Sequence, residues 1–112
     1  MPEVQKIIGQ DAIAAAASAN VCAPAAGKSH VVSTLVIHNP NVASATVDIF
    51  AREAGAAKGT GNQLVNDHPV AAGATETFRL GITLGGTAGD ILTVDAATNG
   101  VTVTAFGAEI TH

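Results

Sequence analysis

Apolar and polar residues alternate along most of this chain, in short runs separated by turn-forming residues. Alternation with a period of two places successive side chains on opposite faces of a β-strand, so it predicts strands with one buried face. The clearest run covers residues 29–39, where Val31, Ser33, Leu35 and Ile37 are predicted to share one face. The pattern therefore favours an all-β protein.

Five further segments have strand character and lie between turn signals. They cover residues 45–53, 63–67, 75–80, 91–96 and 101–110. Together with an extended segment through Val21, they predict an antiparallel β-sandwich or jelly-roll-like barrel of about seven to eight short strands.

Two connections have a distinct composition. Residues 54–62 are rich in glycine and are predicted to form a flexible loop. Asn99-Gly100 is the favoured dipeptide of a type I′ turn. It predicts that the strands before and after it pair as a hairpin, with Ala97 and Thr98 widening the loop.

Residues 10–19 allow two interpretations. Asp11 could cap a short helix built on the alanines that follow, because alanine is the best helix former. Such a helix would bury little, since Ile13 is its one large apolar residue, so an extended segment leading into a strand is favoured.

Composition narrows the possible functions. Ala, Gly, Val and Thr supply 59 of 112 residues (23, 12, 12 and 12), and hydrophobic residues make up 47%. A disordered chain is excluded by this composition. A nucleic-acid binder is disfavoured by a net charge of -4 and a pI of about 5.3, because phosphate binding needs basic residues. The single cysteine, Cys22, excludes an intrachain disulfide and is expected to be a small buried hydrophobe.

The sequence indicates neither a leader nor a membrane span. Glu3 and Lys6 lie near its start, and Gln10-Asp11 interrupts the first apolar stretch. No apolar run reaches the roughly 18 residues that a spanning helix needs. We therefore expect a soluble protein that is made in the cytoplasm and does not bind membranes.

Chemistry-bearing residues are few and scattered. His30 and His38 lie eight positions apart on one predicted strand, or roughly 26 Å, which is too far to share a metal. Lys58 lies in a glycine-rich loop that lacks the Gly-Lys-Ser/Thr sequence of a phosphate-binding loop. No serine lies in a nucleophile elbow. We therefore expect no catalytic, metal or cofactor-binding residues, no cofactor and no enzyme activity.

Several strands carry apolar residues on their second face as well. These are Val32, Val36, Ile91 and Phe106. A domain of this size without disulfides or metals is only marginally stabilised, so these residues could bury surface between subunits. They could equally fill the core of a sandwich.

The chain resembles small all-β accessory virion proteins of tailed bacteriophages. The resemblance begins with a Pro-Ala-Ala-Gly-Lys turn before a strand that ends in an Asn turn, and it covers about residues 21–110. It rests on residues 24–28, 31–39, 64–67, 69–84, 89–91 and 101–110.

This resemblance implies a structural role in the capsid. We expect a cement or decoration protein that stabilises the assembled head, binds the major capsid protein lattice and self-associates, as a homotrimer. It would lie on the capsid surface of virions assembled in the host cytoplasm. The alternative is a host- or glycan-binding component of a tail, neck or head fibre, which the absence of Trp and Tyr disfavours.

The first residues lie outside the resemblance. We expect residues 1–12 to form an N-terminal arm that reaches a neighbour and residues 13–112 to form a single β-sandwich domain. Val4, Ile7 and Ile8 are the predicted apolar contacts of that arm in the assembly.

Overall fold

The computed structural model describes residues 3–13, 17–97 and 100–112. This part of the chain forms eight strands, and a one-turn 3-10 helix, η1 (Glu53–Gly55), follows the fourth. The strands are β1 (Glu3–Ile13), β2 (Ala17–Cys22), β3 (Lys28–His38), β4 (Ala45–Arg52), β5 (Gln63–Val70), β6 (Thr75–Gly85), β7 (Ile91–Ala96) and β8 (Val101–Thr111).

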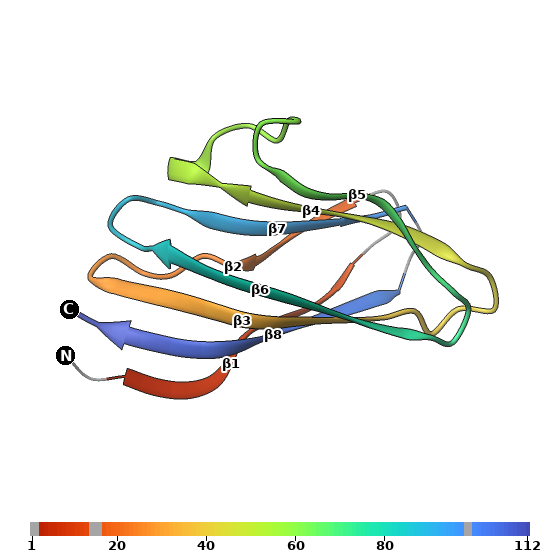
Figure 1. The fold of residues 1–112 in the computed structure, drawn as a ribbon, viewed down its shortest axis with the longest axis horizontal. Coiled ribbons are helices and arrows are strands. Elements are labelled where there is room, and N and C mark those ends of the chain that lie inside the picture. Colours follow the sequence, from red (N-terminus) through yellow and green to blue (C-terminus); the bar gives the residue numbers. More distant parts are fainter. Residues whose placement is uncertain (1–2, 14–16, 98–99) are drawn as a thin grey trace.

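The strands form two antiparallel four-stranded sheets that pack face to face (Figure 1). We call β1-β8-β3-β6 the first sheet and β2-β7-β4-β5 the second sheet. Strand β1 pairs with β8, β2 with β7, β3 with β6 and β4 with β5. This is the pairing of a jelly roll, in which a folded antiparallel ribbon wraps around one core. The all-β jelly-roll sandwich predicted from the sequence is confirmed, although four of its strands are 11 residues long rather than short.

The segment from residue 10 to 19 is extended wherever the structure describes it. Residues 10–13 belong to β1 and residues 17–19 to β2, so the helical alternative is wrong there, while residues 14–16 lie outside the described part. Ile13 and Ala19 are buried in the core, and this burial outweighs the helix propensity of the alanines.

Residues 3–12 of the segment predicted as an N-terminal arm belong to an edge strand of this sandwich, and residues 1–2 lie outside the described part. Strand β1 pairs with β8 from Glu3 to Ile13. The boundary predicted between residues 12 and 13 therefore falls inside a strand, because the apolar side chain of Ile13 closes the end of the same core.

The hairpin predicted around Asn99-Gly100 is wrong. The strands before and after it, β7 and β8, belong to opposite sheets, and the connection between them crosses the sandwich. Asn99 lies outside the described residues, and Gly100 has a positive φ of 90°. Both strands direct valines into the same core from opposite sides, which a two-stranded hairpin could not achieve.

A β-bulge in β3 changes which side chains face the core. The register of β3 shifts against both β6 and β8 between Val32 and Thr34, which leaves Ser33 unpaired. An extra residue reverses the alternation beyond it. Val32 and Leu35 are buried, whereas Ser33 is exposed, so the prediction that Ser33 shares a face with Leu35 is wrong.

The core lies between the sheets and is built mainly from aliphatic side chains. Its largest fully buried apolar residues are Ile13, Leu35, Ile37, Ile49, Leu92, Val32, Val47, Val70, Val94, Val101 and Val103. Val32 is therefore a core residue. No helix in residues 3–13, 17–97 or 100–112 has the length and hydropathy to cross a membrane.

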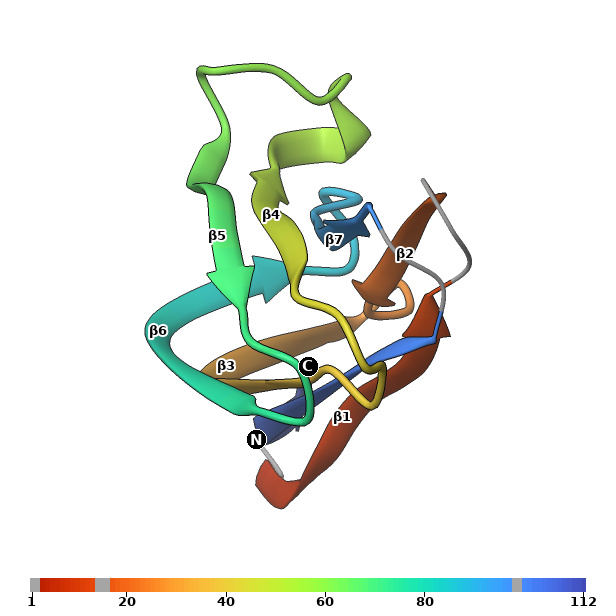
Figure 2. The same cartoon turned by 90° about the vertical axis from the view of Figure 1, so that its right-hand side faces the viewer.

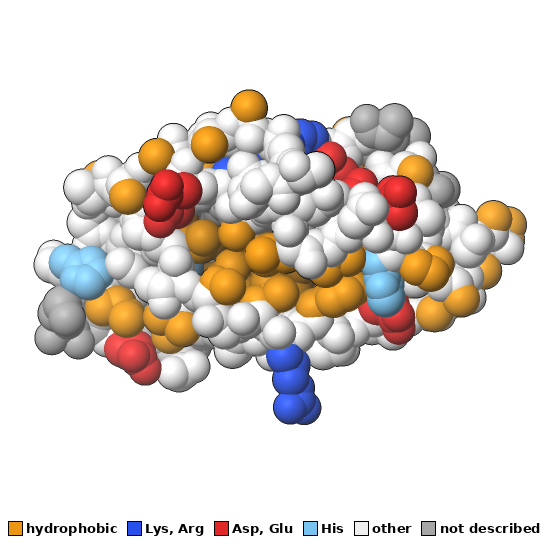
Figure 3. Space-filling view, turned by 45° about the horizontal axis from the view of Figure 1, so that its top comes forward, with side chains coloured by type: hydrophobic (Ala, Val, Ile, Leu, Met, Phe, Trp, Pro, Cys, Tyr) orange, Lys and Arg blue, Asp and Glu red, His pale blue; other side chains and the backbone are white. Residues whose placement is uncertain are grey.

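The two long sides of the sandwich differ. On one side β1 and β2 lie against each other, and a Cβ added at Gly9 would come within 1.9 Å of the Val21 carbonyl oxygen, so only glycine permits this approach. On the other side β5 and β6 belong to different sheets and are not paired as neighbouring strands, although their side chains touch where His68 meets Glu76 (Figure 2). Figure 3 shows a band of hydrophobic side chains between the sheets on the face it presents. Val65, Phe78 and Leu80 are partly buried residues of these two edge strands.

Cys22 is buried, as expected, and burial raises the pKa of its thiol to about 12. The thiolate is the reactive form, so we expect no reaction with a thiol reagent such as Ellman's reagent at about pH 8 while the protein is folded. Adding denaturant should release one equivalent at once. Rapid labelling of the native protein would contradict this prediction.

Candidate assembly surfaces

The outer face of the first sheet is uncharged over most of its area. The strand registers place its outward side chains in rows that run across β1, β8, β3 and β6. We call this surface the first-sheet face. Its positions are Glu3, Gln5, Ile7, Gln10 and Ala12 on β1; Ile110, Ala108, Phe106, Thr104 and Thr102 on β8; Ser29, Val31, Thr34, Val36 and His38 on β3; and Gly85, Thr83, Arg79, Thr77 and Thr75 on β6.

The middle row of the first-sheet face has an apolar centre. Ile7 pairs directly with Phe106, and Phe106 pairs with Thr34 on its other side. Ile7 is 51% exposed and Phe106 is 39% exposed. The carboxylate and the guanidinium on this face, from Glu3 and Arg79, lie on its two edge strands. Among the described residues, the inner strands β8 and β3 thus present no carboxylate, ammonium or guanidinium on this face, and its charges lie on the edge strands.

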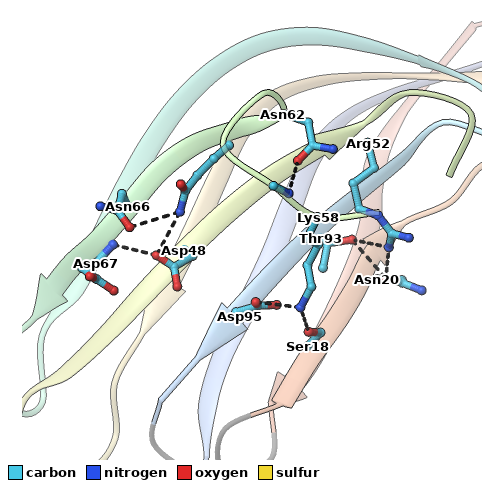
Figure 4. Close-up of polar contacts among 12 residues, drawn as sticks. Ser18, Asn20, Asp48, Arg52, Lys58, Asn62, Asn66, Asp67, Thr93 and Asp95 are labelled. Atoms are coloured by element: carbon cyan, nitrogen blue, oxygen red, sulfur yellow. Dashed lines mark hydrogen bonds and ion pairs between the residues drawn. The ribbon is translucent and has the colours of Figure 1, made fainter. Parts of the chain in front are cut away.

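The outer face of the second sheet is polar and is covered by the chain itself. Figure 4 shows the loop after β4 lying over this face, with Lys58 reaching down to β2 and β7. The Lys58 ammonium donates to Ser18 at 2.5 Å and pairs with Asp95 at 2.8 Å. Nearby, the Arg52 guanidinium donates to Thr93 at 3.2 Å. Hydrogen bonds and ion pairs within the chain thus occupy much of this face.

One phenylalanine lies on the outer side of each sheet, and the two differ in how far the rest of the chain covers them. Phe50, on β4, lies under Lys58, whose ammonium nitrogen is 5.8 Å from the ring centroid, and it is only 7% exposed. In the described part of the chain, no loop covers Phe106, which is 39% exposed. The protein covers one aromatic ring with its own chain and leaves the other open to solvent.

A cluster of charges ties three strands of the first sheet together. Glu109 on β8 accepts hydrogen bonds from Lys6 on β1 at 3.0 Å and from Lys28 on β3 at 3.4 Å. Its second oxygen lies 3.0 Å from Nε2 of His30, which is buried on the inner side of β3. These contacts, led by that with His30, lower the pKa of Glu109 to about 2. The cluster holds the edge strand β1 against β8 and β3.

This cluster predicts a specific acid sensitivity. Because the pKa of Glu109 is about 2 in the folded protein and about 4.5 ordinarily, its stabilising effect is complete above pH 4.5 and is lost as the pH falls towards 2. Glu109→Gln should remove this part of the pH dependence when the free energy of unfolding is measured by urea titration between pH 5 and 2. Glu3→Gln, which alters a carboxylate bonded only to the neighbouring Gln5 amide among the contacts seen, serves as the control. Equal acid dependence in the Glu109→Gln variant and the unaltered protein would contradict the prediction.

The three predicted assembly residues differ in how accessible their side chains are. Val4 is 53% exposed, and Ile7 lies in the middle row of the first-sheet face, on the edge strand β1. Ile8 is 9% exposed and packs in the core, because the register of β1 shifts between Ile7 and Gly9 and turns Ile8 inward. Ile8 is thus unavailable for contact with a neighbour, whereas Val4 and Ile7 keep accessible side chains.

Several of the remaining histidines and carboxylates have local partners. His68 on β5 lies 2.8 Å from Glu76 on β6, and its ring meets Phe78 edge-on at 5.1 Å. Asp90 accepts the backbone N–H groups of Ala54 and Gly85, which lowers its pKa and ties η1 to the end of β6. Within the described residues no group of three or more His, Cys, Asp or Glu side chains is placed to hold a metal ion.

Two shallow hollows mark the surface. One, of about 200 Å³, lies between the end of β4 and β6 and includes Arg52, Leu84 and Asp90 in its lining. The other, of about 240 Å³, lies on the second sheet among Asp48, Lys58 and Asp95, and its wall is the polar network already described. Arg52 and Asp90 in the first hollow bond to the chain itself, as do Asp48, Lys58 and Asp95 in the second.

The sequence pattern does not indicate the Glu109 cluster or the loop that covers Phe50. The cluster joins residues that are 79 to 103 positions apart, and the cover depends on the path of a glycine-rich loop. The sequence does indicate an exposed apolar site at Phe106, because this large apolar residue lies on the polar side of an alternating strand.

Comparison with known proteins supports the fold. No model of a known protein family matches the sequence, and no curated protein matches it. A chain in a structure of infectious bursal disease virus, Gx strain, is similar with a TM-score of 0.50 and 10% identity. The similarity covers 96% of this chain and 31% of that one, so this chain spans less than a third of its viral neighbour.

A second solved structure is also from a virus. A chain of the cyanophage Pam1 capsid asymmetric unit is similar with a TM-score of 0.41 and 15% identity, over 90% of this chain and 79% of that chain.

Proposed function

We propose that this protein is a structural component of a phage virion, and specifically a cement protein that binds the assembled capsid. The observation that carries the proposal is the jelly-roll pairing of its eight strands, an arrangement much used in viral coat domains. The similarity of fold to a chain of infectious bursal disease virus supports it. So does the resemblance of residues 21–110 to phage accessory virion proteins.

A cement protein acts by binding the assembled capsid lattice and does not have to catalyse a reaction. A protein that binds only the assembled shell stabilises it by its binding free energy at every copy. The structure suits this role because the described charged and histidine side chains mostly bond within the chain, while apolar residues remain exposed on β1 and β8. The proposed partner is the major capsid protein lattice, with this protein on the capsid surface as a homo-oligomer, for which the phage resemblance implies a trimer.

Copy number and capsid stability test the proposal. Quantitative mass spectrometry of the phage particles that carry the protein should find on the order of hundreds of copies, as expected for repeated sites on a symmetric shell. Purified protein added to capsids that lack it should raise their temperature of rupture. A few copies per particle, located at the tail, would contradict the proposal and favour the fibre alternative.

Strand β1 can be tested in the same assay. Val4→Thr should weaken binding to the capsid if this edge strand contacts the lattice, because it removes an exposed apolar contact and keeps a strand-forming residue. Leu64→Thr is the matched control, since Leu64 is 45% exposed on β5, in the other sheet.

A further inference from the structure

We propose that two copies of this chain pair through their first-sheet faces, with Phe106 near the centre of the contact and Ile7 beside it on the edge strand β1. This inference does not depend on the capsid role. It starts from the contrast between the two outer faces: the second sheet is covered by the loop that carries Lys58, and the first sheet has no cover from its own chain among the described residues.

The charge pattern of the first-sheet face favours an uncharged partner surface. In the three middle rows, the inner strands β8 and β3 carry alanine, phenylalanine, threonine and valine, and the charged Glu3 and Arg79 lie on the edge strands. Gln5 and Gln10 on β1 are polar but uncharged. A partner with many charges would lose their hydration here without gaining counter-charges. A second first-sheet face meets the requirement, because it is equally poor in charge at its centre.

The size of the face fits a stable pair. Four strands about 4.8 Å apart and five rows about 6.7 Å apart give roughly 650 Å² on each copy. Two copies would then bury about 1,300 Å², which lies within the range of specific interfaces. Face-to-face packing of sheets about 10 Å apart is also the geometry that already builds the core of each copy.

The distribution of residues also matches that of an interface. Protein interfaces have an apolar, aromatic centre and a polar rim. Here Phe106 lies on an inner strand in the middle row, and Arg79 lies in the same row on the edge strand β6. A surface that packs against its own copy must be related by a two-fold axis. This pairing therefore predicts dimers, whereas a trimer has to use two different surfaces.

Sedimentation equilibrium of the purified protein tests the inference. Over about 10 μM to 1 mM, the mass should rise from one chain, 11.0 kDa, to two chains. Thr34→Lys places a charge beside Phe106 and should weaken the pairing by about tenfold or more. Thr46→Lys makes the same change at an exposed position of the second sheet and should leave the pairing unchanged.

A second variant and a salt series separate misfolding from loss of the contact. Phe106→Thr keeps a strand former and should also weaken the pairing by about tenfold, with an unaltered circular dichroism spectrum. The dissociation constant of the unaltered protein should change little between low and high salt, because no charge pair lies at the centre. A protein that stays monomeric throughout would overturn the inference. So would a stable trimer, or pairing that survives both Thr34→Lys and Phe106→Thr.

Discussion

Replacing Leu35 by alanine should lower the free energy of unfolding by about 2–5 kcal/mol, which is a large share of the total for a domain of this size. Leu35 is fully buried in the middle of β3 and faces the second sheet. The core contains mainly small and medium aliphatic side chains, so few neighbours can move in to fill the space. The cost therefore includes both the lost burial and the cavity.

The measurement is a urea titration followed by circular dichroism. Leu35→Ala should shift the midpoint to lower urea with an unchanged slope. Leu64→Ala deletes the same atoms from a side chain that is 45% exposed and should change the free energy of unfolding by less than about 1 kcal/mol. Equal effects of the two substitutions would mean that Leu35 does not lie in the core.

Replacing Asn39 by alanine should destabilise the protein by about 2 kcal/mol or more, because a buried hydrogen-bonding centre would be lost. Asn39 is fully buried where β3 ends. Its amide nitrogen donates to the carbonyl of Ala43 at 2.9 Å and to that of Val70 at 3.0 Å, and its amide oxygen accepts the backbone N–H of Asn41. One side chain thereby fastens the β3–β4 connection to the end of β5.

Asn39→Asp separates hydrogen bonding from size. The carboxylate has the same shape, but it cannot donate to the two carbonyl groups and would carry a charge into a buried place. We expect it to be at least as destabilising as Asn39→Ala at neutral pH, when measured by thermal unfolding. Asn66→Asp, at an exposed position of β5, is the control. A tolerated Asn39→Asp would show that the amide's donors are unimportant.

The sequence was sufficient to predict most strands, because their alternation reports directly which side chains enter the core. Residues 45–53 and 91–96 match β4 and β7 closely. The predicted strand ends are less accurate where the sequence places a glycine or proline. Strand β6 continues through Gly81 to Gly85, and β5 continues through Pro69, because both are edge strands whose outer side makes no ladder hydrogen bonds.

The arrangement of strands and the assembly surface depended on features that local patterns do not carry. The β-bulge at Ser33 switches the two faces of β3 beyond it. His30 therefore points inward to Glu109, whereas His38 points outward to Thr75. The path of the loop after β4 covers Phe50 and leaves Phe106 exposed. Those choices come from packing between distant segments, which a single sequence does not display.

The two termini lie at the same end of the sandwich, as Figure 1 shows, and Glu3 is paired with Ile110. Residues paired across antiparallel strands have Cα atoms only about 5 Å apart. A short linker could therefore join the ends, and the chain could be reopened in the exposed loop near Gly59 to give a circular permutant with the same eight strands. A peptide fused to either of these two ends would extend from the same end of the sandwich, so the protein suits the display of fused peptides.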